Sequence, residues 1–314
     1  MKPQFRVERG KITTNLLDVN ITEHCNLSCR GCNHFSPVLP KRLLTPEDFV
    51  PQLRALAEVL RPGVLKFLGG EPLLHPNIVD LIEAARDSGI SERIALYTNG
   101  TLLHRAPEAV WRAVDEVQIS SYPGSERSDD ELAAFQALAD RHKTELRVEK
   151  FDRFLLPYVR ERTASRVVAQ QIYDSCRFVH VYHCHTLADG HFFKCSQAYF
   201  LPKAIDGVTT ATGIDAVHVS QRATLQADLL AYLNSPDPLD ACGRCLGTAG
   251  PSVPHSQVKR DAWQLDAEAE AVDLLDPRRL AWRPKTRVQR LRDRLGPHRA
   301  RLQRGLARAL TRRG

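Results

Sequence analysis

Apolar residues along the chain follow two alternating periods, and this alternation predicts the fold. Short apolar runs typical of buried strands occur at residues 15–22, 64–68, 94–97, 116–120 and 145–149. Between them, apolar residues recur at helical spacing in a segment that begins at Thr45-Pro46 and in segments 78–88, about 105–114 and about 129–142. Strands that alternate with helices indicate a parallel α/β architecture.

The first four predicted strands end in short polar or glycine-rich segments, at 25–32, 69–72, 98–100 and 120–124. The carboxyl ends of parallel strands meet at one edge of a sheet, and such folds place their chemistry there. Two glycines after a strand also let the backbone approach a ligand closely, because no Cβ is in the way. We therefore expect the four segments to form one site.

Cys25, Cys29 and Cys32 carry the most distinctive chemistry among these residues. A tight loop after a strand can point three thiols, placed within eight positions, at one metal centre. A closed structural site needs four ligands, so three protein ligands leave one metal position open. The alternative is a zinc site in which His24 or His34 supplies the fourth ligand.

Taken together, the Cys-x3-Cys-x2-Cys spacing, Gly69-Gly-Glu-Pro72 and Thr98-Asn-Gly100 resemble the radical S-adenosylmethionine (radical SAM) superfamily. The resemblance implies a [4Fe–4S] cluster on the three cysteines, whose open iron binds the methionine part of SAM. It also implies that Gly69, Gly70 and Glu71 bind the amino group of SAM, and that Ser120 contacts its ribose. For Asn99 two roles stay open, hydrogen bonding to the ribose hydroxyls and formation of the turn after the strand.

Two positions depart from the pattern of this family. Gly31 stands before the third cysteine, where the family usually has an aromatic residue. The acidic residue that often follows the ribose-contacting position is missing after Ser120, and Tyr122 stands near that place. The segment 120–124 is therefore a candidate for remodelling toward the substrate.

Five further cysteines follow later in the chain: Cys176, Cys184, Cys195, Cys242 and Cys245. Residues 184–195 predict a β-hairpin with an Asp-Gly turn. This arrangement resembles the SPASM/twitch extension of radical SAM enzymes. The resemblance implies one auxiliary [4Fe–4S] cluster on Cys195, Cys242 and Cys245, with either Cys176, which we favour slightly, or Cys184 as fourth ligand. A structural zinc knuckle with four thiolates is the alternative.

The resemblance also implies the domain organisation. We expect a radical SAM core over residues 13–165, folded as an open, partial (β/α) barrel with parallel strands. A small cysteine-rich auxiliary-cluster domain would cover 166–250, and a C-terminal extension with a basic helical tail would cover 251–314. About a dozen residues precede the first strand, which argues against a separate leader-peptide-recognition domain.

The net charge of +7 belongs to the end of the chain. Residues 283–314 hold twelve Lys and Arg and one acid, so they contribute +11 and the remainder carries 7 − 11 = −4. Segments 287–295 and 299–310 predict two short basic amphipathic helices, so region 287–313 is expected to meet an anionic membrane surface or an acidic partner. The alternative is an Arg-rich, partly disordered terminus. No aromatic residue is interleaved with the arginines, which argues against nucleic acid binding.

The sequence predicts a cytoplasmic enzyme. It has no run of about eighteen apolar residues and no apolar signal core after Met1, and eight cysteines in a cytosolic chain favour metal ligation over disulfides. By the resemblance, an electron donor protein reduces the first cluster, SAM is cleaved to a 5′-deoxyadenosyl radical, and this radical takes hydrogen from the substrate.

The short single-cluster layout and the Cys-x-x-Cys-x-His-Phe-Ser-Pro run at Cys29–Pro37 resemble family members linked to sugar, polysaccharide or aminocyclitol modification. The resemblance therefore implies a carbohydrate-type small molecule, a sugar or aminocyclitol that is oxidised or epimerised, as substrate. One alternative is a peptide-modifying radical SAM maturase. Another, from a different class, is a non-catalytic zinc or iron–sulfur binding protein.

Overall fold

The computed structural model describes residues 4–156, 158–207, 213–263 and 270–284. In these ranges the strands are β1 (Val7–Glu8), β2 (Lys11–Thr22), β3 (Leu60–Gly69), β4 (Ile94–Thr98), β5 (Glu116–Ser121), β6 (Glu145–Lys150), β7 (Arg153–Leu155), β8 (Cys184–Ala188), β9 (His191–Phe193), β10 (Ala216–His218) and β11 (Ser252–Pro254). The α-helices are α1 (Pro46–Val59), α2 (Ile78–Ser88), α3 (Glu108–Ala113), α4 (Asp129–His142), α5 (Arg166–Ser175), α6 (Ser196–Asp206), α7 (Leu225–Asn234), α8 (Ala271–Leu274) and α9 (Pro277–Leu280).

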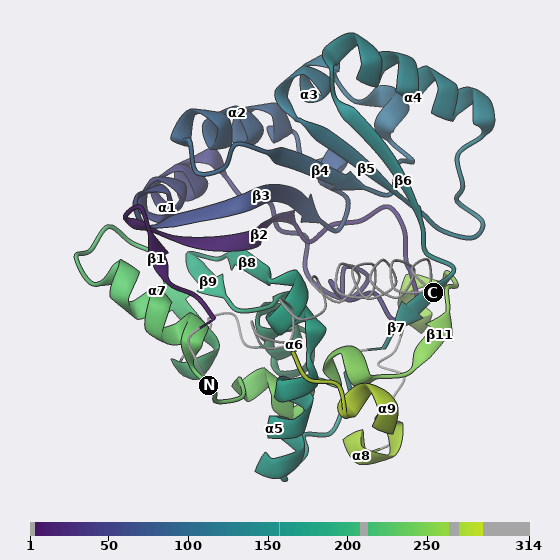
Figure 1. Cartoon of the computed structure of the whole chain (residues 1–314). Coiled ribbons are helices and arrows are strands. Elements are labelled where there is room, and N and C mark those ends of the chain that lie inside the picture. Colours follow the sequence, from purple (N-terminus) through teal and green to yellow (C-terminus); the bar gives the residue numbers. More distant parts are fainter. Residues whose placement is uncertain (1–3, 157, 208–212, 264–269, 285–314) are drawn as a thin grey trace, which may run out of the picture.

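One large sheet organises the molecule (Figure 1). Its strand order is β10-β9-β8-β2-β3-β4-β5-β6, and β1 adds to β2 at the side. The six strands from β8 to β6 are parallel to their neighbours, whereas β9 and β10 continue the sheet as antiparallel strands. This open, mostly parallel sheet with helical crossovers confirms the predicted partial (β/α) barrel.

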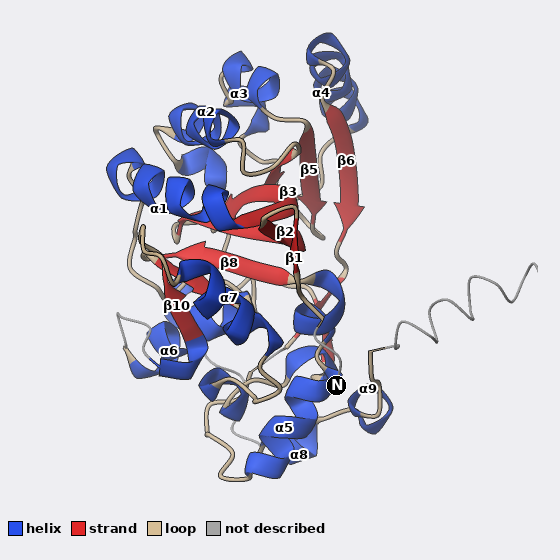
Figure 2. Ribbon diagram, turned by 60° about the vertical axis from the view of Figure 1, so that its left-hand side comes forward, coloured by secondary structure: helices blue, strands red, loops and turns tan. Residues whose placement is uncertain are grey.

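Helices α1 to α4 cover one face of the parallel strands (Figures 1 and 2). Their apolar stripes meet the strand residues that point to the same side, and the contact forms the main hydrophobic core. Phe49 of α1 and Phe67 of β3 are both fully buried there, with ring centroids 6.0 Å apart. The predicted start of α1 is confirmed, because the Thr45 side chain accepts a hydrogen bond of 3.2 Å from the Asp48 N–H.

The opposite, inner face of the same strands is polar near its middle. Asp18 and Asn20 of β2 and Lys66 of β3 point away from the helices, since successive side chains of a strand alternate between its faces. All three are buried, with at most 7% of their surface exposed. Burying such groups costs free energy unless they find partners, so this face is a candidate for function.

The hairpin β8–β9 has a place in the fold that the sequence pattern did not reveal. The hairpin itself is as predicted, with Thr186 opposite Phe193. β8, however, pairs in parallel with β2, where Leu17 lies opposite His185, so the hairpin extends the core sheet on the side away from β3. The cysteines near this hairpin therefore lie beside the first strand of the barrel.

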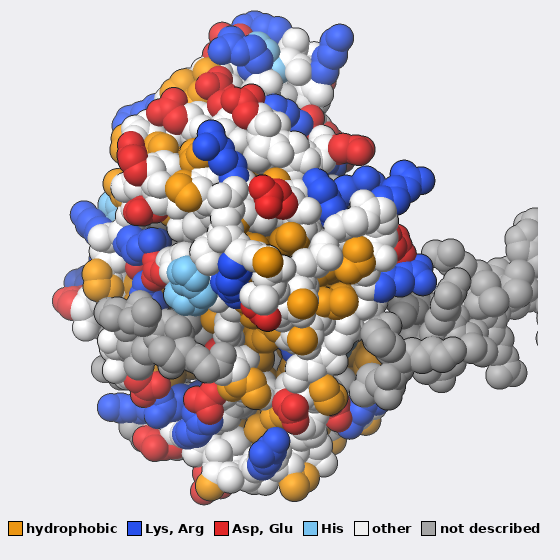
Figure 3. All heavy atoms as spheres, turned by 90° about the vertical axis from the view of Figure 1, so that its left-hand side faces the viewer, with side chains coloured by type: hydrophobic (Ala, Val, Ile, Leu, Met, Phe, Trp, Pro, Cys, Tyr) orange, Lys and Arg blue, Asp and Glu red, His pale blue; other side chains and the backbone are white. Residues whose placement is uncertain are grey.

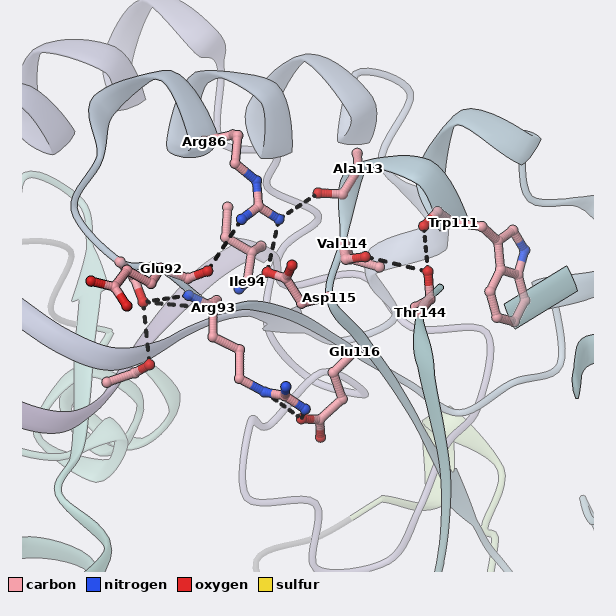
Figure 4. A network of polar contacts seen from close by, with 12 residues as sticks. Arg86, Glu92, Arg93, Ile94, Trp111, Ala113, Val114, Asp115, Glu116 and Thr144 are labelled. Atoms are coloured by element: carbon pink, nitrogen blue, oxygen red, sulfur yellow. Dashed lines mark hydrogen bonds and ion pairs between the residues drawn. The ribbon is translucent and has the colours of Figure 1, made fainter. Parts of the chain in front are cut away.

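A polar network joins the amino-terminal ends of β4, β5 and β6, at the edge opposite to the predicted site (Figure 4). Arg93 donates to Glu116 at 2.6 Å and also bonds to Glu145, and Arg86 donates to Asp115 at 2.8 Å. Asp115 in turn accepts from the Ile94 N–H at 2.7 Å. These contacts hold the strand starts in register and leave the other edge available for chemistry.

Charged side chains of both signs lie on the surface of the described residues (Figure 3). On the face that Figure 3 shows, Lys and Arg side chains are interspersed with Asp and Glu. None of the described helices is both long and apolar enough to cross a membrane. The basic segments within 287–313, and their predicted partners, lie outside the described residues.

Candidate functional site

The loop after β2 is held against the end of β3 by backbone contacts. The Gly70 N–H donates to the Thr22 carbonyl at 2.7 Å, and the Glu71 N–H donates to the His24 carbonyl at 2.8 Å. A Cβ at Gly70 would lie 2.3 Å from the same His24 oxygen, so only glycine fits. The predicted glycine segment therefore lies against the residues that lead directly into Cys25.

Glu71 connects the ends of β3 and β4. Its carboxylate is fully buried and accepts from the Thr98 hydroxyl at 2.6 Å, the Asn99 N–H at 2.8 Å and the Leu73 N–H at 3.0 Å. Burial raises the pKa of Glu71 to about 7, and these three donors oppose the rise. Because donors of the chain already engage both oxygens, the carboxylate fixes the position of Asn99 relative to the end of β3.

Asn99 lies against the first cysteine. Its side-chain amide donates to the Asn26 side chain at 2.9 Å and approaches the Cys25 Sγ at 3.8 Å. Its oxygen accepts from the Thr101 N–H at 2.9 Å. The sequence analysis did not single out Asn26, although a polar residue directly after the first cysteine was the available signal.

The structure brings Cys25, Cys29 and Cys32 together in one tight loop. Cys25 and Cys29 are buried and Cys32 is half-buried. Burial raises the pKa of Cys25 to about 12 and that of Cys29 higher, and the neighbouring thiols add to both shifts. Three such thiolates repel one another, so they become stable together only when a cation lies among them.

Gly31, the departure from the family pattern, has a conformational reason. Its φ is +68°, a left-handed conformation that disfavours an aromatic side chain. A Cβ there would have room, since its nearest neighbour would be Leu156 Cδ1 at 3.6 Å. The turn between Cys29 and Cys32 is therefore shaped by backbone geometry rather than by crowding.

Ser120 lies near the carboxyl end of β5, and Tyr122 directly follows this strand at the same edge. The Tyr122 hydroxyl hydrogen bonds with the Ser120 side chain, and burial raises the pKa of Tyr122, with a further contribution from the three cysteines. The Tyr122 ring stacks on His255, with centroids 4.8 Å apart and planes 13° apart. Tyr122 thus faces the cysteine loop at the position where the family usually has an acidic residue nearby.

A second group of thiols lies in a separate buried cluster with aromatic residues. Cys176, Cys195, Cys242 and Cys245 are all at least 91% buried and share this cluster with Tyr158, Tyr173 and Phe200. The Gly247 N–H donates to the Cys245 Sγ at 3.2 Å, and a Cβ at Gly247 would lie 3.4 Å from the Cys176 Sγ. Four of the five late cysteines therefore gather at one place.

Cys184, the fifth, is placed differently. It begins β8, opposite Leu16 of β2, and is half-buried. Burial is the largest cause of the rise in its pKa, and Asp18 comes next, ahead of Cys195 and Cys176. Its surroundings are those of the polar inner face, whereas Cys176 lies inside the aromatic cluster.

Further polar side chains lie together on the inner face of the sheet. Lys66 Nζ pairs with Asp18 Oδ1 at 2.7 Å and lies 4.7 Å from the centroid of the Tyr97 ring. Burial and next Lys66 lower the pKa of His34 to about 4, and its ring hydrogen bonds to the Gly69 backbone. The Asn20 amide is fully buried and makes no hydrogen bond with any described residue.

The sequence analysis did not identify Asp18 and Asn20. The available signal was the strand run Leu16-Leu-Asp-Val-Asn-Ile-Thr22, in which polar residues occupy every second position of an otherwise apolar strand. His34, which the sequence offered as a possible zinc ligand, instead contacts Gly69 and lies 4.9 Å from the Phe200 ring centroid.

The donor chemistry of the two thiol groups can be compared with possible metal centres. Over the described ranges, no three His, Cys, Asp or Glu side chains converge closely enough to ligate a single metal ion. A four-iron cluster is larger than one ion, and Cys thiolates are its usual ligands. The thiols of the two groups are ligands of the type that such a cluster uses.

Residues 19–155 match the family model of the Radical SAM superfamily. The match covers the predicted core from the middle of β2 to the end of β7. It includes the first three cysteines, the glycine segment, Asn99 and Ser120, and it ends before the second thiol group.

Several curated relatives resemble the same region. A GTP 3',8-cyclase of Chlorobaculum tepidum is 33% identical over 112 residues, which are 34% of this chain and 33% of the relative. A GTP 3',8-cyclase of Streptomyces coelicolor is 27% identical over 171 residues, which are 51% of this chain and 50% of the relative. The chain thus spans only about a third to a half of the length of these relatives.

Solved structures with a similar course of the chain include BtrN in complex with AdoMet and 2-DOIA, with 15% identity and a TM-score of 0.48 over 75% of this chain and 94% of that one. SuiB of Streptococcus suis bound to S-adenosylmethionine has 14% identity and a TM-score of 0.39 over 73% of this chain and 67% of that one. Identities and TM-scores this low support no conclusion about function.

The Gly70 contact generates a first prediction. Gly70→Ala should push the 23–32 loop away from β3, because the new Cβ would lie 2.3 Å from the His24 oxygen. We expect the variant to lose most of the iron that the first three cysteines bind after anaerobic reconstitution, as measured by iron analysis in a background without the late cysteines.

Gly89→Ala is the matched control. Gly89 also has a positive φ, +63°, but a Cβ there meets open space. The control should lose roughly 1–2 kcal/mol of stability through backbone strain and keep its iron. Equal iron in the Gly70 variant and the control would contradict the close-approach role of Gly70.

Proposed function

We propose that this chain, whose residues 19–155 are a radical SAM domain, is an enzyme that cleaves S-adenosylmethionine reductively and takes hydrogen from a carbohydrate-type small molecule. The outcome would be oxidation or epimerisation of the substrate, with an electron donor protein as reductant. One observation carries the proposal: three thiols, two of them buried and one half-buried, follow β2 at the edge where the glycine pair ends β3 and Asn99 follows β4.

In this proposal each residue group has a distinct task. Cys25, Cys29 and Cys32 hold the [4Fe–4S] cluster, which together with SAM supplies a 5′-deoxyadenosyl radical when both are bound. The backbone of Gly69 and Gly70 receives the ammonium group of SAM, and Glu71 keeps Asn99 and the end of β4 in place. Asn99 and Ser120 contact the ribose. The loop and the inner face exclude water, which protects a reactive intermediate.

The test is reductive cleavage of SAM. Cys29→Ala should reduce formation of 5′-deoxyadenosine to the level of enzyme-free controls, because one ligand of the cluster is gone. The measurement is chromatography of the products after anaerobic reconstitution and reduction with dithionite.

Ser28→Ala is the control for this test, since it changes the neighbouring residue of the same loop without removing a thiol. It should retain cleavage within a few-fold of wild type. If reconstituted wild type itself forms no 5′-deoxyadenosine, the proposed activity is wrong.

We further propose an auxiliary [4Fe–4S] cluster on Cys176, Cys195, Cys242 and Cys245. The support is their common burial with aromatic residues, which provides the low-dielectric surroundings in which thiolates need a cation. Cys184 is the weaker candidate for fourth ligand because it is half-buried and lies outside the cluster that holds the other four late cysteines.

Iron counts distinguish the two candidates. Wild type should bind about eight irons, four for each cluster. Cys176→Ala should lose about half of the iron and keep SAM cleavage without substrate, whereas Cys184→Ala should keep nearly all of it. The opposite result would make Cys184 the ligand, and two zinc ions per chain would favour the non-catalytic binding protein.

The substrate class is proposed from the polar inner face. Asp18, Asn20, Lys66 and Tyr97 offer donors and acceptors in close proximity, which suits a ligand with several hydroxyl groups. Lys66 is already paired with Asp18 at 2.7 Å, so the pair adds little net charge. The triphosphate of GTP, which the names of the curated relatives mention, would bring several negative charges to this neutral pair. We therefore favour an uncharged or amino-substituted polyhydroxyl compound.

Asn20 allows a test that separates binding from folding. Asn20→Leu should leave the apoprotein as stable as wild type or more stable by about 1 kcal/mol, because it removes a buried amide without a partner. The same change should abolish stimulation of 5′-deoxyadenosine formation by an amino sugar or aminocyclitol that stimulates wild type. Urea unfolding and product chromatography measure the two effects.

Asn15→Leu is the matched control on the same strand, since Asn15 is exposed and donates to the Val181 carbonyl at 3.2 Å. It should leave the stimulation unchanged. Destabilisation of several kcal/mol by Asn20→Leu, or undiminished stimulation, would contradict a substrate-contacting role for Asn20.

A further inference from the structure

A C-terminal segment far from the first cysteines in sequence lies directly on their loop. We call residues 252–263 the strap. It begins as β11, which pairs with β7, and continues past His255, whose ring stacks on Tyr122. No sequence motif marks this segment, because several of its contacts are made by the backbone, whatever the residue type.

The strap pairs with the cysteine loop like a short strand. Cys29 and Gln257 form an antiparallel bridge. The Arg30 N–H donates to the Ser256 carbonyl at 2.9 Å, and the Val258 N–H donates to the Ser28 carbonyl at 2.9 Å. The Gln257 side chain accepts from the Ser28 N–H at 3.1 Å. Backbone groups of the loop that would otherwise face solvent are therefore satisfied by the strap.

Two side chains at the end of the strap donate to carbonyls of cysteines. The Trp263 indole N–H donates to the Cys29 carbonyl at 2.8 Å, and its ring meets Phe35 edge-on with centroids 5.9 Å apart. Trp263 is 6% exposed, so this bond is shielded from water. Arg260 donates to the Cys25 carbonyl and, at 3.4 Å, to the Ser36 carbonyl.

The position of Arg260 also has an electrostatic consequence. Its guanidinium is positively charged at any relevant pH and lies within hydrogen-bond distance of the Cys25 backbone. Three thiolates and a reduced cluster are negatively charged, and a nearby cation stabilises the more negative state. Charge and hydrogen bonding around a cluster are known levers on its reduction potential.

We propose that the strap is a positioning element for the SAM-cleaving cluster. Its backbone and Trp263 hold the loop of Cys25, Cys29 and Cys32 in the ligating conformation, and Arg260 raises the reduction potential of the cluster. The role of Arg260 rests on the proposed function, whereas the holding of the loop does not. The strap follows Cys242 and Cys245 in the chain, so it also connects the first cysteine loop to the second thiol group.

Amide hydrogen exchange of the apoprotein tests the holding role. Trp263→Phe keeps an aromatic ring against Phe35 and removes only the indole donor. We expect the peptide that covers residues 26–30 to exchange about five- to tenfold faster than in wild type, the change that follows from losing one hydrogen bond. Exchange unchanged in this peptide would overturn the holding role.

The reduction potential tests the charge role. In a background with Cys195, Cys242 and Cys245 replaced by Ala, Arg260→Gln should lower the midpoint potential of the remaining cluster, as followed by electron paramagnetic resonance. Arg260→Lys should restore most of the shift, because it keeps the charge. Lys259 and Arg260 are both exposed, but Arg260 is the one that donates to the Cys25 carbonyl. Lys259→Gln, which removes the same charge from the neighbouring position, is therefore the control and should leave the potential near that of wild type.

The outcomes separate this inference from the proposed function. A wild-type protein that binds no cluster contradicts the proposed function, and the exchange experiment on apoprotein still decides the holding role. Equal potentials in Arg260→Gln and Lys259→Gln, with a cluster present, would overturn the charge role and leave the proposed function intact.

Discussion

The structure depends on the close approach of two backbones at one edge of the sheet. Gly70 and Glu71 at the end of β3 donate to the carbonyls of Thr22 and His24 at 2.7 and 2.8 Å, which brings the cysteine loop against the glycine segment. Parallel pairing of β2 with β3 makes this possible, because both strands then end at the same edge. This contact supports the direct approach of the Asn99 amide to Asn26 and Cys25.

The two thiol groups are connected through α6 and a charged cluster at its side. Cys195 is the N-cap of α6, and Gln197 in its first turn donates to the Asn33 carbonyl, next to Cys32, at 3.0 Å. Further along the helix, Lys203 pairs with the buried Glu23 at 2.9 Å. Removing one partner of such a buried ion pair costs several kcal/mol of folding stability. The pair therefore holds α6 firmly between the two thiol groups.

The two faces of the core strands follow different physical rules. The face toward α1–α4 is apolar and accounts for stability through burial, as in any parallel sheet covered by helices. The inner face buries Asp18 beside Lys66 and leaves the Asn20 amide without a partner in the described structure. Buried polar groups of this kind lower the stability of the fold, and proteins usually accept that loss of stability at functional sites.

The sequence alone determined the alternation of strands and helices and the edge at which the site lies. Apolar periodicity predicted β2–β6 and α1–α4, and the spacing of Cys25, Cys29 and Cys32 indicated the chemistry, because both signals are local along the chain. Tertiary structure alone decided that β8 pairs with β2, that Cys176 rather than Cys184 lies with the other late cysteines, and that Trp263 donates to Cys29. These contacts join residues far apart in sequence, and their partners are chosen by packing and by the need to satisfy buried backbone groups, which no local pattern records.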